Sequence, residues 1–158
     1  MPSNSSPPNS GVSNSGVSNA DVSNSGVSNS DPSNSSQPNV RPLVIKVTVG
    51  IEFPEKLSQA FTVAATALAS GAMVSLWLTG ESVWLAVPGR AEEFALPHAA
   101  DLADLRDAVL AGGQVTVCTQ CAVRRDLTEA DLLPGVLVRG SAAFVEEILA
   151  DGAQALVY

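Results

Sequence analysis

The feature that most constrains the fold is a regular alternation of short apolar runs and helix-like patterns between residues 41 and 158. The first run, Leu43–Val49, is rich in β-branched residues and ends at Gly50, as expected of a strand buried on both faces. Similar runs follow at residues 73–78, 115–118, 136–138 and 155–158. Strands that alternate with helices favour a parallel sheet covered on both faces by right-handed crossovers. We therefore predict an α/β fold, a three-layer α/β/α sandwich with a five-stranded parallel sheet.

Signals for helix ends support this alternation. Pro54 suits the first turn of a helix, Asp101 can cap a second, with Asp104 at the reciprocal position, and Ser141 can cap another. Apolar residues then recur at helical spacing after Pro54, at Leu57, Ala60, Phe61, Ala64 and Leu68. We also expect a short turn at the capping-box pattern of Thr128 and Asp131, and a loop over residues 90–98.

Residues 1–40 have a different composition from the rest of the chain. Asn recurs at every fifth position from Asn4 to Asn39, mostly within Ser-rich units. A period of five fits neither a helix nor a strand, and the segment offers little apolar surface to offset the entropy of ordering. We predict a disordered pentapeptide-repeat tail over residues 1–40 and one domain over residues 41–158. The alternative is a repeat that binds a partner or a modifying enzyme.

The charge balance excludes several classes of protein. The chain has 8 Lys and Arg against 16 Asp and Glu, for a net charge of −8. Such acidity argues against nucleic-acid binding and against docking on an anionic membrane. The sequence shows neither a membrane-spanning run nor a signal peptide, so we expect a cytoplasmic protein. Two Cys and one His cannot by themselves complete a four-ligand zinc site, and no phosphate-binding glycine loop is present. We predict no metal and no cofactor.

Cys118 is the strongest candidate for chemistry. It ends the third predicted strand and opens the next helix, and functional sites of parallel sheets gather at the carboxyl ends of strands. The N–H groups and the dipole of that helix would favour the thiolate, and Arg124 and Arg125 could add positive potential. A thiolate is what a sulfur nucleophile requires. The alternative is a free cysteine that packs as a small hydrophobe.

Cys121 completes the pattern Cys-Thr-Gln-Cys, which has three interpretations. It could be a redox-active dithiol, half of a metal site, or a coincidence. His98 is the only further soft ligand, so the metal interpretation is poor, and we expect His98 to be an inert loop residue. We expect Trp77 and Trp84 to pack in the core. We expect the doublets Glu92-Glu93 and Glu146-Glu147 to be solvated.

The segment Val115–Arg125 resembles the cysteine region of the DsrE/DsrF-like family of sulfur-relay proteins. In its carriers a strand ends in Val-Cys and an Arg pair follows six and seven residues later, as Cys118, Arg124 and Arg125 do here. Thr79-Gly80-Glu81, Asp131–Gly135 and the terminal Ala155–Tyr158 add to the resemblance, which covers about residues 43–158.

The resemblance implies a DsrE-like fold whose final strand returns beside the first, and homo-oligomers that are trimers or hexamers. It also implies a persulfide on Cys118 that is received from a donor protein and passed to an acceptor thiol, with Arg124 and Arg125 contacting the anionic group. Cys121 departs from the carriers, which have a small residue there. Two alternatives therefore stay open: a non-catalytic binding or assembly module, and a thiol redox protein that uses Cys118 and Cys121.

Overall fold

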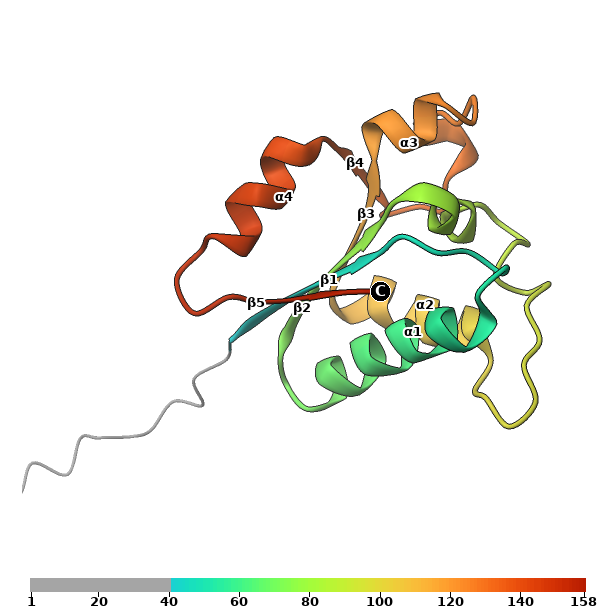
Figure 1. Ribbon diagram of the computed structural model, residues 1–158, viewed down its shortest axis with the longest axis horizontal. Coiled ribbons are helices and arrows are strands. Elements are labelled where there is room, and N and C mark those ends of the chain that lie inside the picture. The colour runs from blue at the N-terminus through green and yellow to red at the C-terminus, as the bar shows by residue number, and fades with distance from the viewer. Residues whose placement is uncertain (1–40) are drawn as a thin grey trace, which may run out of the picture. The chain divides into compact units, whose positions relative to one another are not determined.

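The structure, a computed structural model, describes residues 41–158, so the predicted tail lies outside the described residues. Strands and helices alternate through this part of the chain, as the apolar runs predict (Figure 1). The strands are β1 (Pro42–Val47), β2 (Met73–Leu78), β3 (Gln114–Cys118), β4 (Leu137–Arg139) and β5 (Gln154–Val157). The α-helices are α1 (Pro54–Ala69), α2 (Leu102–Gly112), α3 (Thr119–Val123) and α4 (Ser141–Ile148). Two 3₁₀ segments, η1 (Gly80–Ala86) and η2 (Glu129–Asp131), complete the set.

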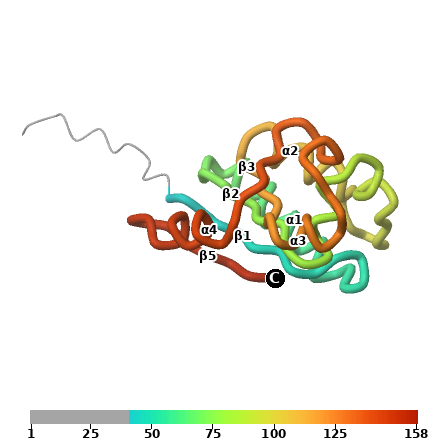
Figure 2. The backbone as a smooth tube through the Cα atoms, turned by 90° about the horizontal axis from the view of Figure 1, so that it is seen from above, coloured from blue at the N-terminus to red at the C-terminus, as the bar shows by residue number. Residues whose placement is uncertain are grey.

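The five strands form one sheet in the order β4-β3-β2-β1-β5, and every neighbouring pair is parallel. The last strand therefore lies beside the first, as the resemblance implies (Figure 2). In this pair Leu43 is the partner of Gln154. The chain moves outward from β1 to β4 and then returns across the sheet to β5. The predicted three-layer sandwich with a five-stranded parallel sheet is confirmed.

The larger core lies between one face of the sheet and helices α1 and α2. Alternate strand residues such as Ile45, Leu76 and Val117 join Phe61 and Val109 in one fully buried cluster. This arrangement follows from the pleat of a strand, which sends every second side chain to the same face. Two predicted helix starts are confirmed. Pro54 is the first residue of α1. The Asp101 carboxylate caps α2 and accepts hydrogen bonds from the amides of Ala103 (2.8 Å) and Asp104 (3.4 Å).

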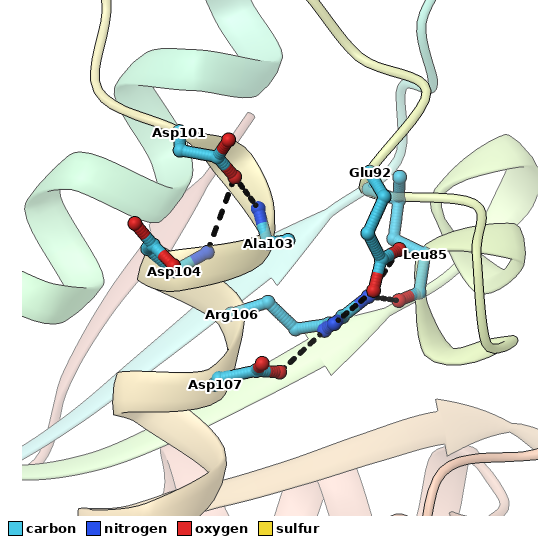
Figure 3. Close-up of polar contacts among 7 residues, drawn as sticks. All are labelled: Leu85, Glu92, Asp101, Ala103, Asp104, Arg106 and Asp107. Atoms are coloured by element: carbon cyan, nitrogen blue, oxygen red, sulfur yellow. Dashed lines mark hydrogen bonds and ion pairs between the residues drawn. The ribbon is translucent and has the colours of Figure 1, made fainter.

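A buried arginine of α2, Arg106, forms hydrogen bonds to the loop that follows η1. Arg106 is only 2% exposed, and its guanidinium donates to Glu92 (2.9 Å), Asp107 (2.8 Å) and the carbonyl of Leu85 (3.5 Å) (Figure 3). The side-chain hydrogen bond from Arg106 is the main reason why the pKa of Glu92 lies below its ordinary value. Glu92 is solvent-exposed, as predicted, but it also pairs with Arg106, because a buried cation needs a carboxylate partner, here 14 positions away in the sequence.

Helix α4 covers the other face of the sheet, on the opposite side from α1 and α2 (Figure 1). The Glu147 carboxylate accepts hydrogen bonds from Ser75 Oγ (2.6 Å), Trp77 Nε1 (2.8 Å) and Gln114 Nε2 (3.2 Å). The ring of Phe144 meets Trp77 edge-on at 5.3 Å. The prediction that Glu147 is solvated is wrong, because the connection from β4 places α4 on this face and brings the carboxylate over three polar side chains. Trp77 is buried as predicted, whereas Trp84 is only half-buried.

The differences from the predicted elements are small. Gly140, and not Ser141, caps α4. The first strand ends at Val47, two residues early, and residues 80–86 form a 3₁₀ segment. Within residues 41–158, no helix is both long and apolar enough to cross a membrane.

Candidate functional site

Cys118 lies at the carboxyl end of β3, where the strand turns directly into α3. It is the N-cap residue of that helix and is half-buried, with part of its side chain packed against the core. Its side chain makes no cap hydrogen bond to α3, which is a single short turn of 5 residues. The expected position at a strand–helix junction is confirmed, but the expected contact between its sulfur and the helix amides is not made.

Cys121 lies one turn later, and its sulfur contacts the segment that follows the neighbouring strand β2. It is 9% exposed, and its Sγ accepts a hydrogen bond from the backbone N–H of Gly80 at 3.2 Å. Gly80 follows β2 and has φ +58, and a Cβ there would lie 2.5 Å from the carbonyl oxygen of Thr48. Only glycine fits this approach without strain. The close approach of Gly80 therefore packs the ends of β1 and β2 together with α3 around Cys121.

The two predicted arginines have different surroundings. Arg125 donates to the carbonyl of Cys121 at 3.0 Å and forms an ion pair with Glu81. It therefore holds the end of α3 to η1. Arg124 is exposed, and within residues 41–158 its side chain forms no hydrogen bond or ion pair with another residue. Arg124 is the C-cap residue of α3 and Arg125 follows it, and consecutive positions at a helix end point in different directions, which explains why the pair is divided.

A third arginine, Arg139, is a neighbour of Cys118 that sequence reasoning missed. It is paired with Cys118 in the register of β3 and β4, and it is 3.8 Å from the Glu147 carboxylate. The sequence contains a signal for this residue, since a basic residue directly follows the fourth predicted strand. The carboxyl ends of parallel strands lie at one edge of the sheet, where such a residue can come close to Cys118. The strand order needed to use that signal comes only from the fold.

The remaining candidates lie apart from this group or do not form a site. His98 is an exposed loop residue with φ +63. In the described part of the chain, no three side chains of His, Cys, Asp or Glu gather into a possible metal site.

Comparison with known proteins assigns the chain to a family. The model of the DsrE/DsrF-like family matches residues 42–158, which is most of the chain. The chain belongs to the DsrE/DsrF-like family. No curated protein sequence matches it.

Two solved structures share the family fold. The YchN protein from E. coli is 16% identical with a TM-score of 0.63, and the match covers 75% of this chain and 99% of YchN. MTH1491 from Methanobacterium thermoautotrophicum, a protein of unknown function, is 12% identical with a TM-score of 0.52 and the same coverage of 75% and 99%. These likenesses show the shared fold and carry no information on the reaction.

Proposed function

We propose that this protein is a small sulfur-transfer protein that carries a persulfide on Cys118 and passes the outer sulfur to an acceptor thiol. The observation that carries the proposal is the unequal placement of the two cysteines. Cys118 is half-buried at the carboxyl edge of the sheet, whereas Cys121 is buried and its sulfur is already engaged by Gly80. Family membership supports the same assignment, since sulfur relay is a general function of DsrE-like proteins.

The chemistry needs only thiols and persulfides. The Cys118 thiolate attacks the outer sulfur of a donor persulfide, the donor S–S bond breaks, and the donor leaves as a thiolate. In the second step an acceptor thiolate attacks the outer sulfur on Cys118, which regains its thiolate. Both steps exchange one S–S bond for another and need no external oxidant. Positive charge from Arg139, beside Cys118 on β4, would stabilise the anionic persulfide, while Arg125 positions α3.

Cys121 supplies a second candidate function, thiol redox chemistry, because it lies one helical turn from Cys118. Its thiolate could attack the inner sulfur of a Cys118 persulfide, which would form a Cys118–Cys121 disulfide and release hydrosulfide. The buried position of Cys121 and its bond to Gly80 oppose this reaction unless α3 shifts.

Mass spectrometry after incubation with glutathione persulfide tests the proposal. We expect the intact protein to gain the mass of one sulfur atom, Cys118→Ser to gain none, and Cys121→Ser to gain it as the wild type does. A protein that stays unmodified while its Cys118 thiol reacts with an alkylating agent would contradict the proposal and favour a binding module. A loss of two hydrogens from the protein mass would instead show the disulfide of the redox function.

A further inference from the structure

A cavity of about 280 Å³ lies at the carboxyl ends of β1 and β2, next to the cysteine site. Its walls come from the segment after β1, from η1 and from the following loop: Gly50, Ile51, Glu52, Glu81, Trp84, Leu85, Arg90 and Glu93. Glu81 ties the cavity to the site, because it pairs with Arg125 and directly follows Gly80, the donor to Cys121. A ligand in this cavity would therefore lie close to α3.

The location of the cavity is typical of a binding site. It lies between the segment that follows β1 and the segment that follows β2, at the carboxyl edge of the sheet, where the sites of parallel α/β sheets gather. The cavity wall formed by residues 50–52 follows β1 directly.

The charges around the cavity favour a cation. Its walls carry three carboxylates, of Glu52, Glu81 and Glu93, and the guanidinium of Arg90, and Glu81 is also paired with Arg125. Glu93 is 3.7 Å from Arg90, and the Glu52 carboxylate accepts a hydrogen bond from the Gly50 amide (2.8 Å) without an ion pair in residues 41–158. The carboxylates do not converge as metal ligands among the described residues. The cation that fits is thus an extended organic group.

Arg90 shows how such a group is accommodated. Its guanidinium lies 5.1 Å from the centre of the Trp84 ring and beside the Glu93 carboxylate. An aromatic face next to a carboxylate is a favourable environment for a guanidinium or an ammonium group.

Size and surroundings indicate a side chain rather than a free metabolite. Pockets for small molecules usually enclose about 300–1,000 Å³, so this cavity is at or below their lower limit. Beside it, Ile51 is 63% exposed and Phe53 is 54% exposed. Exposed apolar residues next to a charged cavity are typical of a protein contact surface.

We propose that this cavity receives a Lys or Arg side chain from the protein that takes the sulfur, while an adjoining apolar residue of that protein packs on Ile51 and Phe53. This inference rests on the proposed function and assigns the acceptor as a basic protein segment. Residues 1–40 contain no Lys or Arg, so the chain's own tail does not supply the side chain. The net charge of −8 also favours encounter with a basic partner.

The test uses two matched fluorescent peptides with the full-length Cys118→Ser protein, which binds without transferring sulfur. Both peptides contain Leu and Cys, and they differ only in an Arg that is replaced by Gln in the second peptide. We expect the Arg peptide to bind more tightly, and Glu52→Gln or Glu93→Gln to weaken its binding about two- to fivefold each, as exposed charge pairs do. Ile51→Ser should weaken both peptides. Asp151→Asn, which removes one charge at the amino end of β5, is the matched control and should have no effect.

Transfer rates from the persulfidated wild-type protein to the two peptides separate the two proposals. Charge-dependent binding without sulfur transfer would contradict the proposed function and leave the contact surface in place. Equal binding and equal transfer rates for both peptides, unchanged in Glu52→Gln, would overturn the inference while the sulfur-transfer function stands.

Discussion

Gly80 shows how one residue can fix the geometry of the candidate site. Its φ of +58 aims its amide at Cys121 Sγ, and the absence of a side chain lets it approach the Thr48 carbonyl. Gly89 has a similar conformation, with φ +84, but a Cβ there would meet nothing within 4 Å. The two positions therefore separate the effect of backbone strain from the effect of the close contact.

We predict that Gly80→Ala destabilises the fold more than Gly89→Ala does. The left-handed conformation alone costs an alanine about 1–2 kcal/mol, and at residue 80 the clash with Thr48 adds to that cost. Chemical denaturation of both variants measures the difference in free energy of unfolding. Equal losses would show that the approach of Gly80 to Thr48 is not as close as described.

At the same scale, the Glu92–Arg106 pair predicts a pH dependence of stability. Because Arg106 lowers the pKa of Glu92 in the folded protein, the pair stabilises the fold above the ordinary carboxyl pKa of 4.5. That contribution is lost as pH falls through 4.5 towards the lower pKa of the folded state. The stability difference between wild type and Glu92→Gln should therefore be largest near neutral pH and shrink below pH 4.5. Glu93→Gln, whose carboxylate has only an exposed partner, should show a smaller change.

At the scale of elements, α4 differs from α1 and α2 in how it is held. None of its residues is fully buried, whereas α1 contributes Leu57, Phe61 and other residues to the core. The strongest contacts of α4 are the hydrogen bonds of Glu147 to β2 and β3 and the contact of Phe144 with Trp77. One carboxylate therefore supplies much of the attachment of this helix.

Replacing Glu147 with Ala should loosen α4 and leave the buried Trp77 Nε1 without an acceptor. An unsatisfied buried donor costs about 1–3 kcal/mol, so we expect a stability loss of that size. In a Trp84→Phe background, the emission of Trp77 should shift to longer wavelength and acrylamide should quench it more strongly. Glu146→Ala, at the exposed neighbouring position, is the control and should change neither measurement. Unchanged emission in Glu147→Ala would show that other contacts hold the helix.

At the scale of the whole molecule, no strand within residues 41–158 pairs with the outer side of β5. The backbone of Tyr158 forms hydrogen bonds with Lys46 and Thr48 of the neighbouring segment. Because the hydrogen-bonding direction alternates from one residue to the next along a strand, the backbone groups of Ala155 and Val157 point away from the sheet. β5 contains neither a charge nor a proline that would discourage pairing with another strand. Val157 is 66% exposed, and Leu149, the C-cap residue of α4, is 75% exposed. We propose that a second copy of the chain pairs with this edge.

Light scattering on the purified protein should then give a mass greater than one chain. Val157→Lys places a charge on this edge and should reduce that mass. Val123→Lys is the matched control, since Val123 on α3 is also 66% exposed, and it should leave the mass unchanged. A wild-type protein that has the mass of a single chain would refute the assembly.

The sequence by itself determined the order and type of the elements between residues 41 and 158. The apolar runs mark the strands because each strand is largely buried, and Pro54 and Asp101 mark helix starts because backbone amides there lack partners within the helix. Cys118 could be placed at a strand–helix junction for the same reason. These signals are local, so a few neighbouring residues are enough to produce them.

Only the tertiary structure decided which distant residues meet. It brought Gly80 to Cys121, Arg139 beside Cys118, Glu92 to Arg106 and Glu147 over Trp77. Each contact joins residues 14 or more positions apart, and the local pattern of one segment holds no information about the other. Strand order determines which strand ends share an edge of the sheet. The face to which each crossover leads determines which carboxylates lie on the same face. These two features therefore decide the distant contacts.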